Sequence, residues 1–191
     1  MRVVIKPAGL FMLIAAFAVL CGLAFWGRPR PLTAGAKAPS ATTDLFGGGT
    51  WELLVIAPGA GAMKERVDIV PGVSEPTRVY AVTLLKPVSN PWELNIHLPT
   101  SAAVVKGEKL RMTFRARSAD AVPLVMNFEQ NSEPYIKSVT RDIRTASEWG
   151  LHTIDFTAQA GYAPKTSHTT LYCGLKPGTV EIADMRLTRR P

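Results

Sequence analysis

The sequence predicts an all-β fold, an antiparallel jelly-roll β-sandwich preceded by one N-terminal hydrophobic helix. Three observations support this fold class. After residue 44, short segments alternate apolar and polar residues with a period of two, as half-buried strands do. Turn-forming residues, for example Pro71-Gly72 and Lys176-Pro177-Gly178, separate these segments. A sustained helical period is absent from this region, and many short strands without helices pack as two sheets or as a barrel.

Residues 1–30 contain the predicted hydrophobic helix. Their uncharged apolar run, residues 8–26, follows two basic residues and ends at Arg28. At about 1.5 Å per residue, a helix of this length is close to the thickness of the hydrocarbon core of a bilayer. We therefore expect a signal anchor with its N-terminus inside the cell, or a signal peptide if the chain is cleaved near Ala34. The domain that follows is expected to be extracytoplasmic, membrane-anchored in the first case and secreted in the second.

The rest of the chain divides into a spacer and one domain. Residues 31–43 (PLTAGAKAPSATT) are mostly small, contain proline and show no period, which predicts a flexible spacer. Residues 44–191 are long enough to bury a hydrophobic core, and Cys173 is their only cysteine, so no intrachain disulfide is expected. The formal net charge of +7 is scattered rather than gathered in a basic run, and no aromatic-rich RNA motif occurs, so nucleic acid is not an expected partner.

The strands of this domain are predicted from the alternation and the turns between them. Gly47-Gly48-Gly49 precedes the first strand, and Ser89-Asn90-Pro91 and Lys106-Gly107 are examples of the turns that separate later ones. The predicted strands cover residues 51–57, 64–70, 77–86, 92–98, 108–118, 122–130, 135–144, 149–158, 168–175 and 179–188.

Alternation also assigns side chains to the interior or to the opposite face of a strand. The expected core includes Trp51, Trp92, Leu94, Ile96, Leu98, Leu110, Met112, Phe114, Ala116, Val122, Leu124, Met126, Phe128 and Ile154. Strands 92–98, 108–118 and 122–130 are consecutive, so we expect them side by side or in one sheet. Their shared polar face would then carry Arg111, Arg115, Asn127 and Glu129.

We interpret this polar face as a candidate sugar-binding site. Planar groups with several donors or acceptors suit sugar hydroxyls, which need partners in fixed positions. Aromatic rings pack on the apolar C–H faces of pyranoses, and Tyr135 and Tyr162 are the aromatic residues expected to be exposed. The alternative interpretation pairs Arg111 and Arg115 with glutamates on neighbouring strands, and both interpretations can hold together.

Catalytic motifs are scarce in this sequence. It contains no nucleophile elbow, no metal-binding histidine pair and no cysteine–histidine pairing. A glycosidase would need a carboxylate pair such as Glu93 with Glu129 or Asp155, but polar strand faces commonly carry glutamates. We therefore predict that the protein is not an enzyme.

From about residue 78, the order of motifs resembles a known family. The motifs are PWEL (91–94), KGEKLRMTFRAR (106–117), VMNFEQ (125–130), ASEW (146–149), HTIDF (152–156), LYCG (171–174) and GTVEIADMRL (178–187). Their order is similar to that of carbohydrate-binding modules of families 4 and 9, galactose-binding-like jelly rolls appended to xylanases and cellulases. The resemblance implies a sandwich that binds a glycan chain along a concave sheet face without catalysis. Members often hold a structural calcium, and Asp184 matches the late acidic position, although Thr43-Asp44-Leu45-Phe46 departs from the usual acidic motif near the domain start.

The sequence therefore predicts a non-catalytic carbohydrate-binding module whose partner is a polysaccharide or oligosaccharide. The expected ligand-binding residues are Arg111, Arg115, Asn127 and Glu129, with Tyr135 stacking on a sugar ring. The alternative function is a structural or protein-interaction sandwich of a cell-surface complex that has no sugar site.

Overall fold

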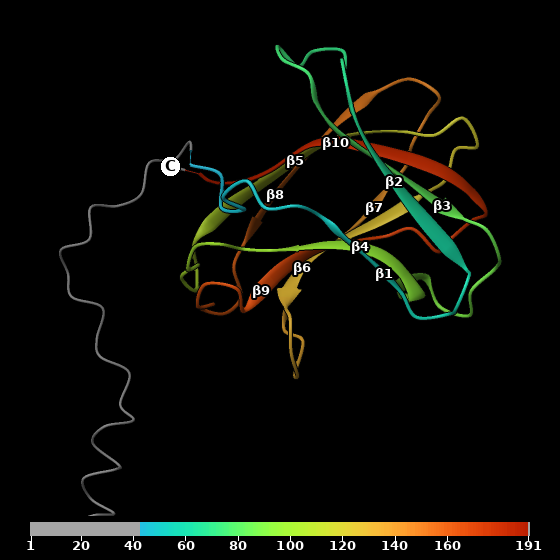
Figure 1. The fold of residues 1–191 in the computed structure, drawn as a ribbon. Helices are drawn as coiled ribbons and strands as arrows, with labels where there is room; N and C mark the ends of the chain where they lie inside the picture. Colours follow the sequence, from blue (N-terminus) through green and yellow to red (C-terminus); the bar gives the residue numbers. More distant parts are fainter. Residues whose placement is uncertain (1–42, 191) are drawn as a thin grey trace, which may run out of the picture. The chain divides into compact units, whose positions relative to one another are not determined.

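Two antiparallel sheets of five strands each form the fold of residues 43–190, the part of the chain described by this computed structural model (Figure 1). The first sheet has the strand order β1-β4-β9-β6-β7, and the second sheet has the order β2-β3-β10-β5-β8. The predicted all-β sandwich is thus confirmed, and its two sheets are consistent with a jelly roll. The predicted hydrophobic helix over residues 1–30 and the spacer up to residue 42 lie outside the described residues.

All ten predicted strands are present, with ends that differ by a few residues from the expected ones. They are β1 (Glu52–Val55), β2 (Gly61–Asp68), β3 (Thr77–Leu84), β4 (Leu94–Pro99), β5 (Lys109–Arg117), β6 (Leu124–Gln130), β7 (Lys137–Ile143), β8 (Gly150–Thr157), β9 (Ser167–Tyr172) and β10 (Gly178–Arg189). The helical element of residues 43–190 is one short 3₁₀ turn, η1 (Pro91–Glu93). Within the same residues, no helix has the length and apolar character needed to cross a bilayer.

The two sheets divide the three strands that the sequence predicted to lie together. β4 and β6 belong to the first sheet, on either side of β9, whereas β5 belongs to the second sheet. The expectation that all three share one polar face is therefore wrong. The alternation of apolar and polar residues shows which side chains point inward. It does not show whether a strand belongs to the same sheet as the strand before it or to the other sheet, because the pattern is identical in both cases.

The core lies between the inner faces of the two sheets. Met112 and Phe114 of β5 and Met126 and Phe128 of β6 are fully buried, as the alternation predicts. Tyr162, which was expected to be exposed, is buried with its ring edge-on to Phe128 at 5.6 Å between centroids. An isolated β-bridge between Val104 and Tyr162 holds the loop that contains Tyr162 against the sandwich. The sequence of a loop does not reveal such a bridge.

The first described residues are fixed to the last strand. The backbone N–H of Leu45 donates to the carbonyl of Leu187 over 2.7 Å, and the N–H of Leu187 donates to Asp44 Oδ1 over 3.1 Å. Leu187 belongs to β10, which is the central strand of the second sheet.

Candidate functional site

A groove of about 690 Å³ lies on the outer face of the first sheet. Because Leu94, Ile96 and Leu98 of β4 are buried in the core, the residues between them point outward and line the groove. The floor is supplied by alternate residues of three neighbouring strands: Asn95, His97 and Pro99 of β4, His168, Thr170 and Tyr172 of β9, and Glu129 of β6.

Trp92 gives the groove an exposed aromatic wall, contrary to the prediction that it belongs to the core. Its side chain is 48% exposed and lines the groove with Leu54 and Ile56. Trp92 lies in η1, before β4 begins, so the strand alternation does not extend to it. The turn is fixed by Glu93, whose carboxylate accepts hydrogen bonds from Ser89 N and Asn90 Nδ2.

Tyr135 is a second exposed aromatic residue of the groove, as predicted. Its side chain is 53% exposed, and its φ of 51° lies in the left-handed region, which a bulky residue rarely occupies. The loop is held by Tyr135 N donating to Ser132 O over 2.8 Å and by Asn131 Nδ2 donating to Lys165 O over 2.7 Å. The ring is therefore presented on a constrained loop, and such strain is typical of ligand-binding positions.

Asn127 is on the same face of β6 as Glu129 but does not line the groove. Its side chain is fully buried, and its Oδ1 accepts a hydrogen bond from Thr140 Oγ1 at 2.8 Å, while its Nδ2 donates to Thr170 Oγ1 at 3.4 Å. Thr170 Oγ1 in turn donates to Glu129 Oε1 at 3.3 Å. This chain of buried polar groups fixes the orientation of Glu129, since each member is satisfied by its neighbours. Asn127 is thus a positioning residue for the groove.

Glu129 is a nearly buried carboxylate on the groove floor, 5% exposed. Burial alone would raise its pKa, but the hydrogen bond from His168 and the charge of Lys137 hold the pKa below its ordinary value. His168 Nε2 lies 3.5 Å from Glu129 Oε1, and Lys137 Nζ lies 3.6 Å from Oε2. The carboxylate is therefore ionised at neutral pH and remains an acceptor on the floor.

His97 lies beside His168, with 5.8 Å between the ring centroids. Burial lowers the pKa of His97, and the neighbouring His168 lowers it further. At neutral pH the His97 ring is therefore uncharged, with one nitrogen that donates and one that accepts a hydrogen bond. The groove floor thus offers both donors and acceptors.

Arg111 and Arg115 do not belong to this groove, because β5 lies in the second sheet. Arg111 forms a bidentate pair with Asp155 of β8 at 2.7 and 2.9 Å, and Arg190 shares the same carboxylate at 2.9 Å. Arg115 donates from Nη2 to the carbonyl of Gly72 over 3.1 Å. The predicted five-residue site is thus divided. Glu129 and Tyr135 line the groove, Asn127 is buried beside it, and the two arginines lie on the outer face of the other sheet.

A loop and a tryptophan cover the part of the second sheet that contains Arg115. Val70 of the β2–β3 loop is buried in a cluster with Val79 and Ala183, and Val73 and Trp149 pack against this cluster. Trp149 also packs beside Arg117, whose guanidinium carbon is 4.8 Å from the ring centroid, and Arg117 pairs with Glu181 at 2.6 Å. The arginines of β5 therefore form contacts within the fold, as the alternative interpretation expects. The partners of Arg111 and Arg115 are Asp155 and the carbonyl of Gly72, however, and not the expected glutamates.

The carboxylates considered for catalysis are not arranged as a pair. Asp155 lies on the second sheet, and Glu93 is engaged with its own turn, whereas Glu129 lies in the groove of the first sheet. Among the residues that line the groove, Glu129 is the single carboxylate.

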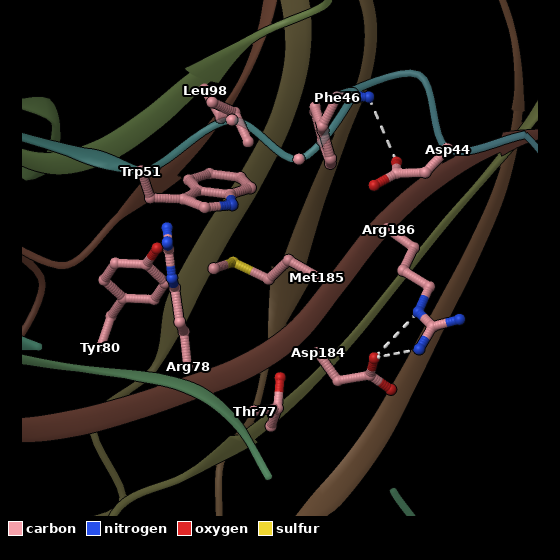
Figure 2. Close-up of a pocket in the computed structure, with 12 residues that line it drawn as sticks. Asp44, Phe46, Trp51, Thr77, Arg78, Tyr80, Leu98, Asp184, Met185 and Arg186 are labelled. Carbon is pink, nitrogen blue, oxygen red and sulfur yellow. Dashed lines mark hydrogen bonds and ion pairs between the residues drawn. The ribbon is translucent and has the colours of Figure 1, made fainter. Parts of the chain in front are cut away.

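The residues around Asp184 do not fit the calcium ion that the family resemblance implies. Its Oδ1 accepts hydrogen bonds from Nε and Nη2 of Arg186, both at 2.9 Å, as Figure 2 shows. Asp44, which lines the same cavity, uses Oδ1 to accept hydrogen bonds from two backbone N–H groups. Residues 43–190 contain no group of three histidine, cysteine, aspartate or glutamate side chains placed to hold a metal. Calcium binding at Asp184 stays a prediction from the family resemblance.

Several groove residues were not identified from the sequence. His168 and Tyr172 join the groove because β9 lies between β4 and β6, and Lys137 joins it from β7 on the other side of β6. The order of strands in a sheet is not encoded in local alternation. One signal was available: His168, Thr170 and Tyr172 occupy alternate positions of a predicted strand, which places them on one face.

Comparison with known proteins shows similarity in fold. No protein-family model matches the sequence, and no curated protein matches it. A solved structure described as "CBM4 structure and function" has a TM-score of 0.57 at 14% identity, covering 73% of this chain and 86% of that one. The N-terminal cellulose-binding domain of a β-1,4-glucanase from Cellulomonas fimi has a TM-score of 0.50 at 17% identity, covering 71% of this chain and 91% of that one. The enzymatically active domain of bacteriophage CBA120 tailspike protein 4 has a TM-score of 0.55 at 7% identity, and the match covers 73% of this chain but 19% of the tailspike chain.

Proposed function

We propose that this protein is a non-catalytic carbohydrate-binding module whose ligand, a polysaccharide or oligosaccharide, lies in the groove of the first sheet. We further propose that residues 1–30 direct the domain out of the cytoplasm and anchor it to the membrane. One observation carries the binding proposal. Two exposed aromatic rings, Trp92 and Tyr135, flank a floor of hydrogen-bonding groups that are already held in place.

The aromatic residues supply the apolar half of sugar recognition. Trp92 and Tyr135 each leave about half of a large ring in water, which is unfavourable in the free protein. A pyranose that packs its C–H face on either ring removes apolar surface from water while its hydroxyls stay free to form hydrogen bonds. The groove volume of about 690 Å³ is within the usual range of small-molecule sites, which is about 300–1,000 Å³.

The floor supplies the polar half. The Glu129 carboxylate can accept hydrogen bonds from sugar hydroxyls. Its neighbours His168 and Lys137, at 3.5 and 3.6 Å, leave some of its lone pairs available. His97 and Asn95 add donors and acceptors along β4. Because hydrogen bonds from Thr170 and its neighbour Asn127 already hold Glu129 in place, little side-chain entropy is lost there when a ligand binds.

Two observations favour binding over catalysis. Hydrolysis of a glycoside by the usual route needs two carboxyl groups across the scissile bond, and the groove lining contains one. The fold is also that of the structure described as "CBM4 structure and function" and of a cellulose-binding domain, which supports a binding module.

The test is retention of the full-length protein in affinity electrophoresis through gels that contain plant, microbial or host polysaccharides. We expect retention by at least one polymer, and we expect Trp92→Ala and Tyr135→Ala to abolish it. Arg111→Ala is the matched control, because it removes a large exposed side chain from the second sheet and should leave retention unchanged. If no polymer in a broad panel retains the unmutated protein, the proposal fails, and the protein-interaction module takes its place.

A further inference from the structure

A second cavity, of about 300 Å³, opens where β3 and β10 separate. β10 pairs with β3 from Gly178 to Ala183, and its register with β5 then shifts between Ala183 and Arg186. This bulge moves β10 away from the beginning of β3. Figure 2 shows the resulting cavity between Thr77 and Arg78 of β3 and the segment Asp184–Arg186 of β10.

The back wall of the cavity is apolar. Phe46 and Trp51 meet edge to face at 5.5 Å between centroids, and Tyr80, Leu98 and Met185 complete the wall. In Figure 2 the indole nitrogen of Trp51 lies on the ring edge that faces Met185. No hydrogen bond joins that nitrogen or the Tyr80 hydroxyl to another residue drawn there. The wall therefore offers donors to a ligand as well as apolar surface.

The rim carries charges that balance. Asp44 and Asp184 provide two carboxylates, and Arg78 and Arg186 provide two guanidinium groups. Each carboxylate uses its Oδ1 within the protein, Asp44 for backbone N–H groups and Asp184 for Arg186. Their Oδ2 atoms remain acceptors for a ligand. A ligand with a net charge gains little from such a rim, whereas a neutral ligand with many hydroxyls finds acceptors and donors close together.

Backbone strain places Asp184 at this rim. Its φ of 48° lies in the left-handed region, where residues other than glycine occur rarely. Continued pairing of β10 with β3 would have avoided this strain and closed the cavity. Strain of this kind is found at binding sites, where the surrounding structure holds it in place.

We propose that the cavity between β3 and β10 is a second sugar site, which takes one ring of a neutral carbohydrate, such as a chain end or a single branch residue. A volume at the lower limit of small-molecule sites admits one ring and not an oligomer, since such sites start at about 300 Å³. The apolar wall receives the C–H face of the ring, and the rim pairs with its hydroxyls. The cavity shares no lining residue with the groove, so the two sites are independent.

Tryptophan positions allow a test that separates the two sites. Trp51 lines the cavity, Trp92 lines the groove, and Trp149 packs on the second sheet. In the ¹⁵N-labelled full-length protein, each indole N–H gives its own NMR signal, assigned by Trp→Phe variants. We expect at least one neutral monosaccharide among glucose, xylose, galactose, mannose and arabinose to shift the Trp51 signal saturably, with no change at Trp149. Absence of a saturable Trp51 shift with all five sugars would overturn the proposal, whatever occurs at Trp92.

Two aspartate variants provide the matched control. Asp184→Asn keeps the side-chain shape, and asparagine tolerates a positive φ, so the fold should persist. It should weaken the Trp51 response at least about tenfold, as expected when a hydrogen bond to a charged group is lost. Asp68→Asn also removes a carboxylate paired with an arginine two residues away, but outside the cavity, and should leave the response intact.

An unchanged response in Asp184→Asn, or its loss in Trp92→Ala, would show that the shift arises elsewhere and would refute the site. Should Asp184→Asn unfold, Arg186→Gln, at a side chain that is 59% exposed, replaces it with the same expected weakening.

Discussion

Glu129 shows how the contacts that stabilise a buried side chain can also orient it toward the groove. Its carboxylate is nearly buried, yet it is held ionised by His168, Lys137 and Thr170. Such a group is costly to leave without partners, so each neighbour that fixes it also orients it toward the groove.

The lowered pKa of Glu129 predicts a pH dependence of folding. A carboxyl group whose pKa is lower in the folded than in the unfolded state stabilises the fold above its unfolded pKa, and this stabilisation is lost as the pH falls through the folded pKa. The ordinary pKa is 4.5, so the loss begins near that pH and continues below it. We expect Glu129→Gln to lower the free energy of unfolding at pH 7. The decrease in this free energy between pH 5 and pH 3, measured by urea unfolding, should be smaller in the variant than in the wild type.

The control is Glu148→Gln, at an exposed residue, which should keep the wild-type profile. A Glu129→Gln profile that parallels the wild type would contradict this account.

A second residue-scale prediction concerns the core. Phe114 is fully buried, and its ring is stacked on His152 with 5.1 Å between centroids. Phe114→Ala should reduce the free energy of unfolding by about 3–5 kcal/mol, because it removes apolar contacts and leaves a cavity. Chemical denaturation followed by tryptophan fluorescence measures this change. A near-neutral result would show that the inward face of β5 is wrongly assigned.

At the scale of elements, the β2–β3 loop shows how an arginine on a polar strand comes to form a contact within the fold. The loop folds over the second sheet, where Val70 is buried with Val79 and Ala183, and Gly72 accepts a hydrogen bond from Arg115. A polar strand face that appears free in the sequence is thus covered by a loop from the same sheet.

Gly72 and Gly107 allow this contact to be measured. Both have a positive φ, 76° and 85°, so alanine is strained at either position. A Cβ at Gly72 would lie 2.5 Å from Arg115 Nη2, whereas a Cβ at Gly107 would meet no atom within 4 Å. We expect Gly72→Ala to cost about 0.5–1.5 kcal/mol more than Gly107→Ala, roughly one hydrogen bond. In an Arg115→Ala background this excess should disappear. Equal costs in the wild-type background would mean that the loop does not depend on Arg115.

At the scale of the whole molecule, the sequence predicted the fold better than the site. The alternation located every strand and the inward side chains of β5 and β6, because the pleat of a strand forces neighbouring residues to opposite faces. It also led to Glu129 and Tyr135, which line the groove. It did not reveal that Arg111 and Arg115 lie on the other sheet from Glu129, because the assignment of a strand to one sheet or the other depends on contacts far apart in the sequence. It failed for Trp92 because a 3₁₀ turn interrupts the alternation just before β4.

The cellular location remains a prediction from residues 1–30. We expect the full-length protein in the membrane fraction, with the domain accessible to protease added from outside the cytoplasm. Deletion of residues 1–30 should shift the protein to the cytosol, which provides the control. Recovery of the intact full-length chain from the cytosol would contradict the predicted export.

The contact between Asp44, Leu45 and Leu187 has a mechanical consequence. If residues 1–30 anchor the protein to the membrane and the domain holds a polymer, as we propose, tension from the preceding chain reaches the described domain at Asp44. There it is passed to β10, which is flanked by β3 on one side and β5 on the other. A pull on an edge strand can break its single row of hydrogen bonds one after another. A pull on the middle strand instead loads two rows of hydrogen bonds at once, so force applied through Asp44 meets a strand that is held on both sides.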